Sequence, residues 1–180
     1  MRHLYAEKRQ AGASRVELAV AVAVVGVLAA ALLERVLYVE EYAEKTAMEL
    51  TIANLQSGLR ARVGSLLIAD QASKIPTLVN DNPIDWLDGK PGNYLGEFPE
   101  QPAQDAKGHW YFDSKRRELV YTANNRLHFT PSLYRDYSVR LRVMPVLGSQ
   151  AALPGKSTGQ QDWVALVVVN DYRWFEQLAR

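Results

Sequence analysis

Few residue types in this chain could do chemistry, and none of them stands in a catalytic pattern. The stretch "PGKSTG", residues 154–159, holds the Gly-Lys-Ser of a phosphate-binding loop, but Gln150 occupies the position of the upstream glycine that the loop needs. The histidines His3, His109 and His128 are neither spaced as metal ligands nor set in a nucleophile motif. The sequence therefore predicts a protein that is not an enzyme.

Three aspartates, Asp81, Asp85 and Asp88, are the best candidates for metal ligands. Carboxylates are hard ligands suited to calcium, but Pro83 and the spacing do not match the EF-hand loop. Asp and Asn are also common turn residues, which accounts for them without a metal. We predict no metal and no cofactor.

Composition narrows the remaining classes of partner. The chain has 180 residues, 48% of them hydrophobic, and a formal net charge of +1. The basic turn at Lys115, Arg116 and Arg117 is the one candidate for contact with DNA, and against so small a net charge we do not expect nucleic acid as a partner. The absence of cysteine excludes disulfides, thiolate zinc sites and cysteine nucleophiles.

One carboxylate raises a sharper question. Glu17 stands at the head of an uncharged run, Leu18 to Leu33. A carboxylate near the membrane interior costs about 2 to 3 kcal/mol, so it normally persists only with a partner. The basic residues before the run predict an N-terminus in the cytoplasm and a C-terminal part across the membrane. The chain continues past Leu33 without a cleavage signal, so the plausible cut lies before the run, at Gly12.

The segment "RQAGASRVELAVAVAVVGVLAA" resembles the class III signal of type IV pilins and type II secretion pseudopilins. In that family a basic leader ends in Gly, and cleavage leaves Glu as the fifth mature residue, which is Glu17 when counted from Ala13. The stretch Val25–Ala30, with Gly26, is similar to the apolar motif of the family helix. The resemblance covers about residues 1 to 60. It departs from the pattern at Ala13, where Phe is commoner, and at Arg15, where an apolar residue is usual.

The resemblance implies a sequence of events at the N-terminus. Prepilin peptidase would cleave between Gly12 and Ala13, and the new amine of Ala13 would be N-methylated. Glu17 of one subunit would then meet the amine of its neighbour, and Gly26 would permit close helix packing in the assembly. The implied partners are other pilin or pseudopilin subunits, the peptidase, the inner-membrane assembly platform and membrane lipid. The calcium loop of major pseudopilins has no match in Gly148–Gln161, which lacks a carboxylate.

The elements that position these residues follow from the apolar pattern. A helix is predicted from Ser14 to Leu67, roughly 80 Å long at 1.5 Å per residue. We expect residues 1–12 as leader, 13–35 as membrane and polymerisation helix, and 36–68 as an amphipathic helix. Its predicted packing stripe, set against a polar face with a Glu41–Lys45 pair, consists of Val36, Val39, Ala43, Ala47, Leu50, Ile52, Leu55, Leu59, Val63 and Leu66.

The remainder predicts a sheet domain. Residues 69–108 are rich in Pro and Gly and are expected to be a connection between helix and sheet. Residues 109–180 contain four stretches rich in β-branched and aromatic residues, which predict a four-stranded antiparallel sheet. In the third, Val139, Leu141 and Val143 should face the helix and Arg140 and Arg142 the other side. The predicted class is α+β, as in pilins.

Three hypotheses cover these features. The first, which the sequence favours, is a structural subunit of a type IV pilus-like or type II secretion pseudopilus filament, with a minor subunit preferred because the calcium loop is missing. The second is an uncleaved single-pass protein that anchors a periplasmic binding module. The third, a membrane-anchored periplasmic enzyme, lacks a convergent polar site. In each, the chain is placed in the bacterial inner membrane with its C-terminal domain in the periplasm.

Overall fold

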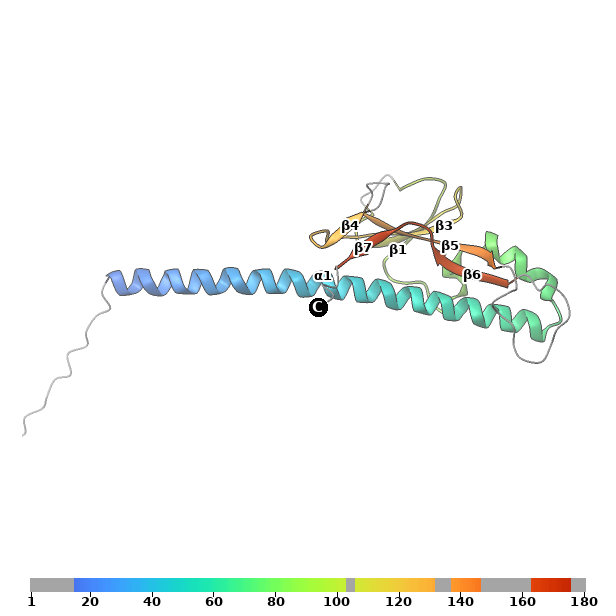
Figure 1. Ribbon diagram of the computed structural model, residues 1–180, viewed down its shortest axis with the longest axis horizontal. Helices are drawn as coiled ribbons and strands as arrows, with labels where there is room; N and C mark the ends of the chain where they lie inside the picture. Colours follow the sequence, from blue (N-terminus) through green and yellow to red (C-terminus); the bar gives the residue numbers. More distant parts are fainter. Residues whose placement is uncertain (1–14, 103–105, 132–136, 147–162, 176–180) are drawn as a thin grey trace, which may run out of the picture. The chain divides into compact units, whose positions relative to one another are not determined.

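The structure is a computed structural model that describes residues 15–102, 106–131, 137–146 and 163–175 (Figure 1). It divides into two compact units, Met1–Glu40 and Glu41–Arg180. A single helix, α1 (Arg15–Ile68), contributes to both. It ends one residue beyond the predicted Leu67, and the prediction of one long helix is confirmed over its described length.

In the first unit, every described residue, Arg15 to Glu40, is exposed. The segment is rich in Ala and Leu, which favour helix, while its many valines are stiff at χ1 and favour it less. Apolar residues lie on all faces of the helix, a pattern typical of a helix whose surroundings are apolar. The large exposed hydrophobic side chains here are Val16, Leu18, Val20, Val22, Val24, Val25, Val27, Leu28, Leu32, Leu33, Val36, Leu37, Tyr38 and Val39.

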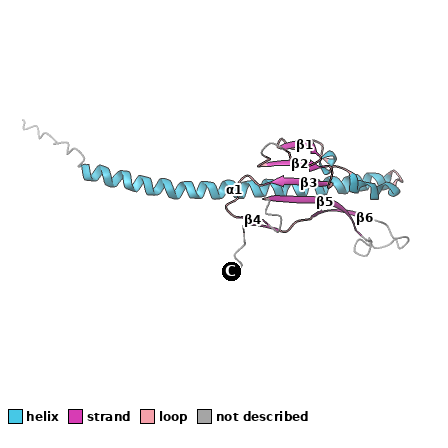
Figure 2. Cartoon of the chain, turned by 90° about the horizontal axis from the view of Figure 1, so that it is seen from above, coloured by secondary structure: helices cyan, strands magenta, loops and turns pink. Residues whose placement is uncertain are grey.

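The second unit is an α+β domain. Its described residues after α1 form two 3-10 helices, η1 (Ala72–Asn80) and η2 (Pro83–Trp86), and seven strands. Five of the described strands form the main sheet in the order β1-β2-β3-β5-β6 (Figure 2), and β4 pairs with β7 in a separate ribbon (Figure 1). The strands are β1 (Tyr94–Phe98), β2 (His109–Asp113), β3 (Glu118–Thr122), β4 (Phe129–Pro131), β5 (Ser138–Val146), β6 (Trp163–Val168) and β7 (Tyr172–Trp174).

The prediction of a four-stranded antiparallel sheet is wrong in strand number and in direction. The first three expected stretches form β2, β3 and β5, and the fourth divides into β6, which stays in the antiparallel sheet, and β7, which pairs with β4. Strand β1 adds a fifth strand to the main sheet, parallel to β2. It arises within the Pro- and Gly-rich connection, where Gly96 takes a φ of 120° beside a shift in register. A strand interrupted by glycine gives only a weak β signal, which is why the pattern did not predict it.

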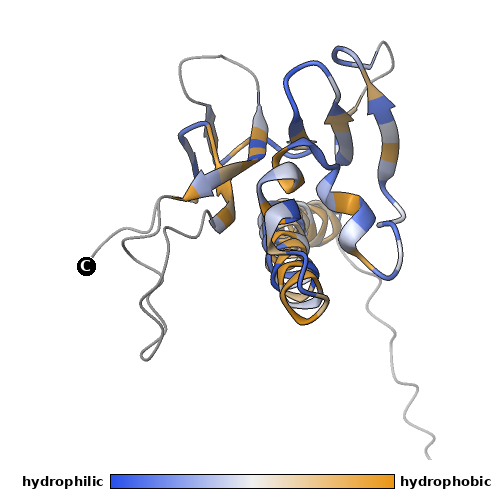
Figure 3. Ribbon diagram, turned by 90° about the vertical axis from the view of Figure 1, so that its right-hand side faces the viewer, coloured by the Kyte–Doolittle hydropathy of each residue, from blue (hydrophilic) through white to orange (hydrophobic). Residues whose placement is uncertain are grey.

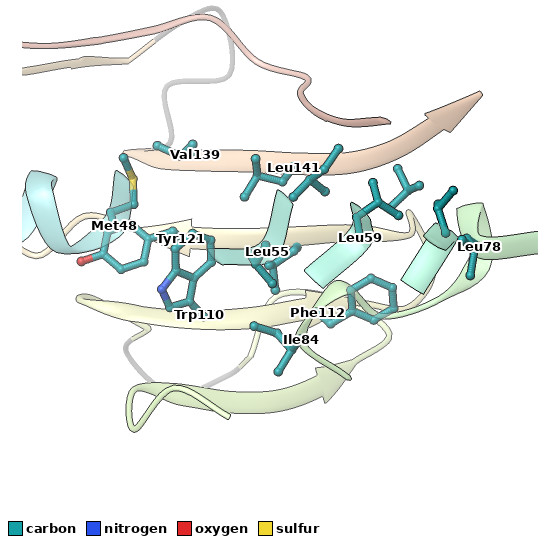
Figure 4. Packing of buried hydrophobic residues seen from close by; sticks show 14 of the residues in the cluster. Met48, Leu55, Leu59, Leu78, Ile84, Trp110, Phe112, Tyr121, Val139 and Leu141 are labelled. Carbon is teal, nitrogen blue, oxygen red and sulfur yellow. The ribbon is translucent and has the colours of Figure 1, made fainter. Parts of the chain in front are cut away.

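The hydrophobic core lies between α1, the 3-10 helices and one face of the sheet. Figure 4 shows Leu55 and Leu59 of α1 pointing toward Trp110, Phe112 and other side chains of the strands. Leu55 is fully buried, as are Leu119 and Val139 on the sheet. The predicted orientation of the third strand is confirmed, because Val139, Leu141 and Val143 belong to this core.

The predicted packing stripe on α1 is half wrong. Its second half holds, since Leu55, Leu59, Val63 and Leu66 are buried and Ile52 packs against the core. The first half, Val36, Val39, Ala43, Ala47 and Leu50, is exposed, and the buried positions there are Glu41 and Met48. Residues 41, 48 and 55 recur every seven positions and so share a helix face, whereas Ala43, Ala47 and Leu50 lie on another.

The other face of the sheet is mixed, and Figure 3 shows hydrophobic and hydrophilic residues interleaved along the strands. Tyr111 and Val120 are buried there with Ala106. Nearby, the buried carboxylate of Glu118 accepts from the guanidinium groups of Arg140, at 3.3 Å, and Arg142. The ion pairs with this one buried carboxylate let the two arginines lie on the same sheet face as Tyr111 and Val120.

Candidate functional site

Glu17 and Gly26 both lie on the exposed part of α1. Glu17 is in the first turn, where a carboxylate also interacts favourably with the helix dipole. A Cβ atom built on Gly26 would meet nothing within 4 Å, so nothing in the described chain requires glycine there. Nine residues separate them, which on an ideal helix places them on opposite faces. The structure therefore does not bring these two predicted residues onto one surface.

The predicted cleavage site, Gly12 and Ala13, lies outside the described residues. Arg15 begins α1 and stands two residues before Glu17, and residues at that spacing do not face each other on a helix. Among the described residues, none is placed as a hydrogen-bond or ion-pair partner of the Glu17 carboxylate. A partner for this charge, where it has one, has to come from beyond the described part of the chain.

In the part of the chain that the structure describes, one helix is long and apolar enough to cross a membrane, α1 near the N-terminus. This rests on its length and composition, and its most apolar stretch has no residue buried within the protein. Arg35 lies just past the uncharged run, and its guanidinium carbon is 5.4 Å from the ring centre of Tyr38. Arg and Tyr are the residue types that gather at membrane interfaces.

Glu41, the first residue of the domain, is fully buried at 0% exposure. Its Oε1 accepts from the backbone N–H of His128 at 2.9 Å and from the indole Nε1 of Trp174 at 3.0 Å. Its Oε2 lies 2.8 Å from Nδ1 of His128, and because an ionised carboxylate only accepts, the network assigns a hydrogen to Nδ1. Glu41 thus joins α1 to the start of β4 and to β7.

Glu44, one turn later, makes a second set of bonds to the same region. Its Oε1 accepts from the hydroxyl of Tyr121 at 2.9 Å and from the backbone N–H of Asn124 at 2.6 Å, and its Oε2 accepts from the N–H of Asn125 at 3.0 Å. Burial raises the pKa of the Tyr121 hydroxyl, and the adjacent Glu44 carboxylate raises it further. Together Glu41 and Glu44, the carboxylate pair, hold the loop of residues 123–128 against α1.

This buried role of Glu41 differs from the surface pair with Lys45 that the helix spacing predicts. Lys45 instead lies 3.5 Å from Glu49, at the ordinary i, i+4 spacing. A signal was present in the sequence, since Glu41 precedes Met48 and Leu55 by seven and fourteen residues and so shares their buried face. A charge on an apolar helix face indicates a buried partner elsewhere in the chain.

Aromatic side chains complete the packing around the carboxylate pair. The ring of Phe175 stacks on His128 with centroids 4.9 Å apart and meets the edge of Tyr42 at 5.6 Å. Phe129 on β4 lies 5.1 Å from Trp174 and 5.6 Å from Tyr172 on β7. These contacts make the end of the domain nearest Glu41 a packed cluster of aromatic side chains.

Of the three aspartates considered for calcium, Asp81 and Asp85 line one recess and Asp88 does not. Asp85 lies 3.2 Å from Lys90 in an exposed ion pair, and the part of the chain that the structure describes contains no group of three or more residues able to hold a metal. A shallow recess of about 600 Å³ opens beside them and brings both signs of charge together, so its lining favours no one ligand class. It is lined by Gly58, Ala61, Arg62, Ser65, Asp81, Asn82, Asp85 and Trp86.

The basic turn between β2 and β3 has structural partners. The carboxylate of Asp113 accepts from the backbone N–H groups of Lys115 and Arg116, which shapes the turn. The side chain of Lys115 lies 3.4 Å from Glu100, and Arg117 donates to the carbonyl of Asn80 at 2.9 Å. The stretch "PGKSTG" lies outside the described residues.

Comparisons with protein families, with curated proteins and with solved structures found no match for this chain. What it can do therefore has to be argued from its own residues. They provide one exposed apolar helix segment headed by a carboxylate, followed by a domain in which the buried Glu41 and the half-buried Glu44 bind the loop of residues 123–128 to the same helix.

Proposed function

We propose that this chain is a structural subunit, a minor one, of a type IV pilus-like or type II secretion pseudopilus filament. Prepilin peptidase would release residues 1–12, and the mature protein would sit in the bacterial inner membrane with its domain in the periplasm. Assembly would proceed through the first part of α1, by contact with other subunits and with an inner-membrane platform. The role is mechanical, and no catalytic step is proposed.

The observation that carries the proposal is the exposure of α1 from Arg15 to Glu40. Its apolar side chains find no cover in the described chain, and burying one such side chain stabilises by about 1.5 to 3 kcal/mol. So many exposed apolar side chains require an apolar environment, which lipid or neighbouring helices would supply. The domain needs none of them, because its own core begins at Met48.

Glu17 favours a filament subunit over a simple anchor. An anchor needs only about 20 apolar residues, and a carboxylate at its head would add cost without benefit. Cleavage after Gly12 would create an amine at Ala13, four residues before Glu17. Within one helix such an amine could approach its own Glu17, but pairing with a neighbour's carboxylate would in addition set the axial step between subunits.

The first test is the intact mass of the protein isolated from membranes. We expect loss of residues 1–12 and one added methyl group on Ala13. A mature species that still carries the leader would contradict the filament proposal and would favour the alternative of an uncleaved anchor for a periplasmic binding module. Cleavage without methylation would remove only the second half of the expectation.

The second test compares two carboxylates at opposite ends of the uncharged run. Glu17→Gln keeps the shape and removes the charge, so cleaved protein should accumulate in the inner membrane and fail to enter filaments. Glu34→Gln is the matched control, because Glu34 is also exposed on the same helix, and this variant should assemble normally. Arg15→Leu should also assemble, since Arg15 and Glu17 do not face each other. Normal incorporation of Glu17→Gln would contradict the partner argument.

A further inference from the structure

The two edges of the main sheet differ in how they are protected from other chains. At one edge, β1 has a shift in register, a φ of 120° at Gly96, and a carboxylate at Glu97 that accepts from Asn82 at 2.9 Å. Irregular backbone and charge are features that keep an edge strand from pairing with another chain. At the other edge, β6 has the sequence WVALVV, without charge, proline or glycine. Figure 2 shows β6 as the last strand on this side, so it is the unprotected edge of the described sheet.

The backbone of β6 directs alternate residues toward β5 and away from it. Just past the strand, the N–H of Val169 donates to the carbonyl of Arg140 on β5 at 2.9 Å. Hydrogen bonding alternates along an antiparallel pair, so every second residue back from Val169 also bonds to β5. The residues between them direct their N–H and C=O groups to the free edge, and they are Val164, Leu166 and Val168. No hydrogen bond joins these groups to another residue of the described chain, and such a row is a template for an added strand.

A second copy of β6 can satisfy all of these free backbone groups. In an antiparallel pair, two residues exchange both hydrogen bonds only when each directs its backbone groups toward the other strand. Two β6 strands meet this condition in full when a two-fold axis passes through Leu166, which sets Leu166 opposite its counterpart and Val164 opposite Val168 of the second copy. Any other register leaves some of the groups unpaired. Since β6 carries no charge, no like charges oppose each other, and the strand is complementary to itself.

We propose that β6 is an interaction surface for a second copy of this chain, in which two β6 strands pair antiparallel about Leu166 and join two main sheets into one. The side chain of Val168, 45% exposed in the single chain, would then pack against Val164 of the second copy. A two-fold pair closes on itself and does not propagate, so this contact belongs to subunits outside a filament. The inference goes beyond the proposed filament role and does not rest on it.

The absence of cysteine allows a direct test on the full chain in detergent micelles. In the proposed register, Ala165 of one copy faces Val167 of the other, with Cα atoms about 4.5 Å apart, which a disulfide can bridge. Two copies of either variant place their cysteines about 8 Å apart, beyond that range. Ala165→Cys and Val167→Cys, one of them mass-tagged, would be mixed and oxidised with copper phenanthroline. We expect the mixed disulfide to form several-fold faster than either symmetric one, and Ile68→Cys, 91% exposed, is the control for random collision.

A proline substitution tests the direction of the backbone groups. Val168→Pro removes an N–H that faces the free edge, where edge strands tolerate proline. Added to Ala165→Cys, it should leave the melting temperature nearly unchanged and reduce the mixed disulfide to the level of Ile68→Cys. Val167→Pro, one residue away, removes a bond to β5 and should instead lower the melting temperature by several degrees or more. The disulfide comparison decides the proposal even where Val168→Pro does not fold.

Three results would overturn the proposal. Equal rates for the mixed and symmetric disulfides would show that two copies meet without this register, as contact through α1 alone would produce. A mixed disulfide that persists in folded Val168→Pro would show that the edge N–H groups take no part. Faster cross-linking of Ala165→Cys to a Glu97→Cys variant would identify β1 of a second copy as the occupant. None of these results depends on cleavage after Gly12, so the filament proposal stands or fails separately.

Discussion

The two stretches of α1, Arg15–Glu40 and Glu41–Ile68, are one continuous helix with opposite relations to the rest of the chain. The first is apolar on all faces and buries none of its described side chains. The second is rich in charged residues and buries Leu55 completely. Total hydrophobicity therefore does not decide which part of a helix joins a folded core. The arrangement of apolar residues on one face does.

The two stretches of α1 also differ in how their glutamates are paired. In the first stretch Glu17 has no described partner, and its proposed role depends on another molecule. In the second, Glu41 is less exposed than any apolar residue of the first stretch, because three donors surround its carboxylate. A charged residue on a helix can thus mark either a contact between molecules or one within the molecule, and the donors nearby distinguish the two.

The largest effect is expected at Glu41. In a soluble fragment beginning at Glu40, Glu41→Ala should lower the free energy of unfolding by about 3 kcal/mol, since it leaves the N–H groups of His128 and Trp174 without an acceptor. Denaturant unfolding measures this. Glu49→Ala, which removes an exposed pair on the same helix, is the control and should change it by about 0.5 kcal/mol or less. Equal losses of unfolding free energy in the two variants would show that the buried bonds of Glu41 stabilise the fold no more than an exposed ion pair does.

Two glycines of the second stretch should respond in opposite directions to alanine. A Cβ on Gly58 would lie 3.0 Å from the carbonyl oxygen and 3.1 Å from the Cβ of Trp86, whereas one on Gly64 would meet nothing within 4 Å. Gly64→Ala should stabilise the fragment by up to about 1 kcal/mol through helix propensity. Gly58→Ala should destabilise it by about 1 kcal/mol, because overpacking outweighs that gain. The melting temperatures of the two variants measure this difference. Stabilisation by both substitutions would show that Trp86 in η2 can move away from the added methyl group at little cost.

A smaller effect is expected in alkali. The pKa of Tyr121 is raised in the folded state, so its contribution to stability is complete below about pH 10 and is lost as the pH rises above that value, where the unfolded chain ionises first. The slope from this one tyrosine is at most about 1.4 kcal/mol per pH unit. Tyr121→Phe should flatten the fall in unfolding free energy above pH 10. An unchanged slope would mean that other groups cause the alkaline loss.

The smallest effect is expected from calcium. Asp85 already pairs with Lys90, and no described group of ligands surrounds a metal position. Adding millimolar calcium to the fragment should therefore leave its melting temperature unchanged, with magnesium as the control for ionic strength. A stabilisation specific to calcium would show that the domain binds it, by mass action on the folded state.

Much of the fold could be predicted because it depends on local patterns. The long helix follows from continuous helical periodicity without proline before Pro76, and the facing of β5 follows from the alternation of Val139, Arg140 and Leu141. Strand β1 could not be predicted, because Gly96 weakens its pattern and its pairing to β2 is parallel. The pairing partner of a short strand is a property of the whole domain.

Some residues of the candidate site could also be predicted from the sequence, and others could not. The assembly roles of Gly26 and Glu17 are predicted from the resemblance of the N-terminal segment to a class III signal, and helix geometry adds that the two residues lie on opposite faces of α1. The roles of Glu41 and Glu44 could not be read from neighbours in the sequence, because their donors lie up to 133 residues away. Helix periodicity could have placed Glu41 on the buried face, but only the folded chain shows which donors meet it.

That separation determines when the domain can be completed. The bonds of Glu41 close loops of 87 residues to His128 and 133 residues to Trp174, and the second cannot form until the chain is synthesised, and in the proposed topology translocated, past β7. Long-range contacts of this kind form late, because the entropy of loop closure is lost before the contact stabilises the fold. Until then, the folded part of the domain would be stabilised by the packing of α1 against the β2–β3 hairpin. The hydrogen bond between Trp174 and Glu41 can thus form only after β7 has reached the rest of the domain.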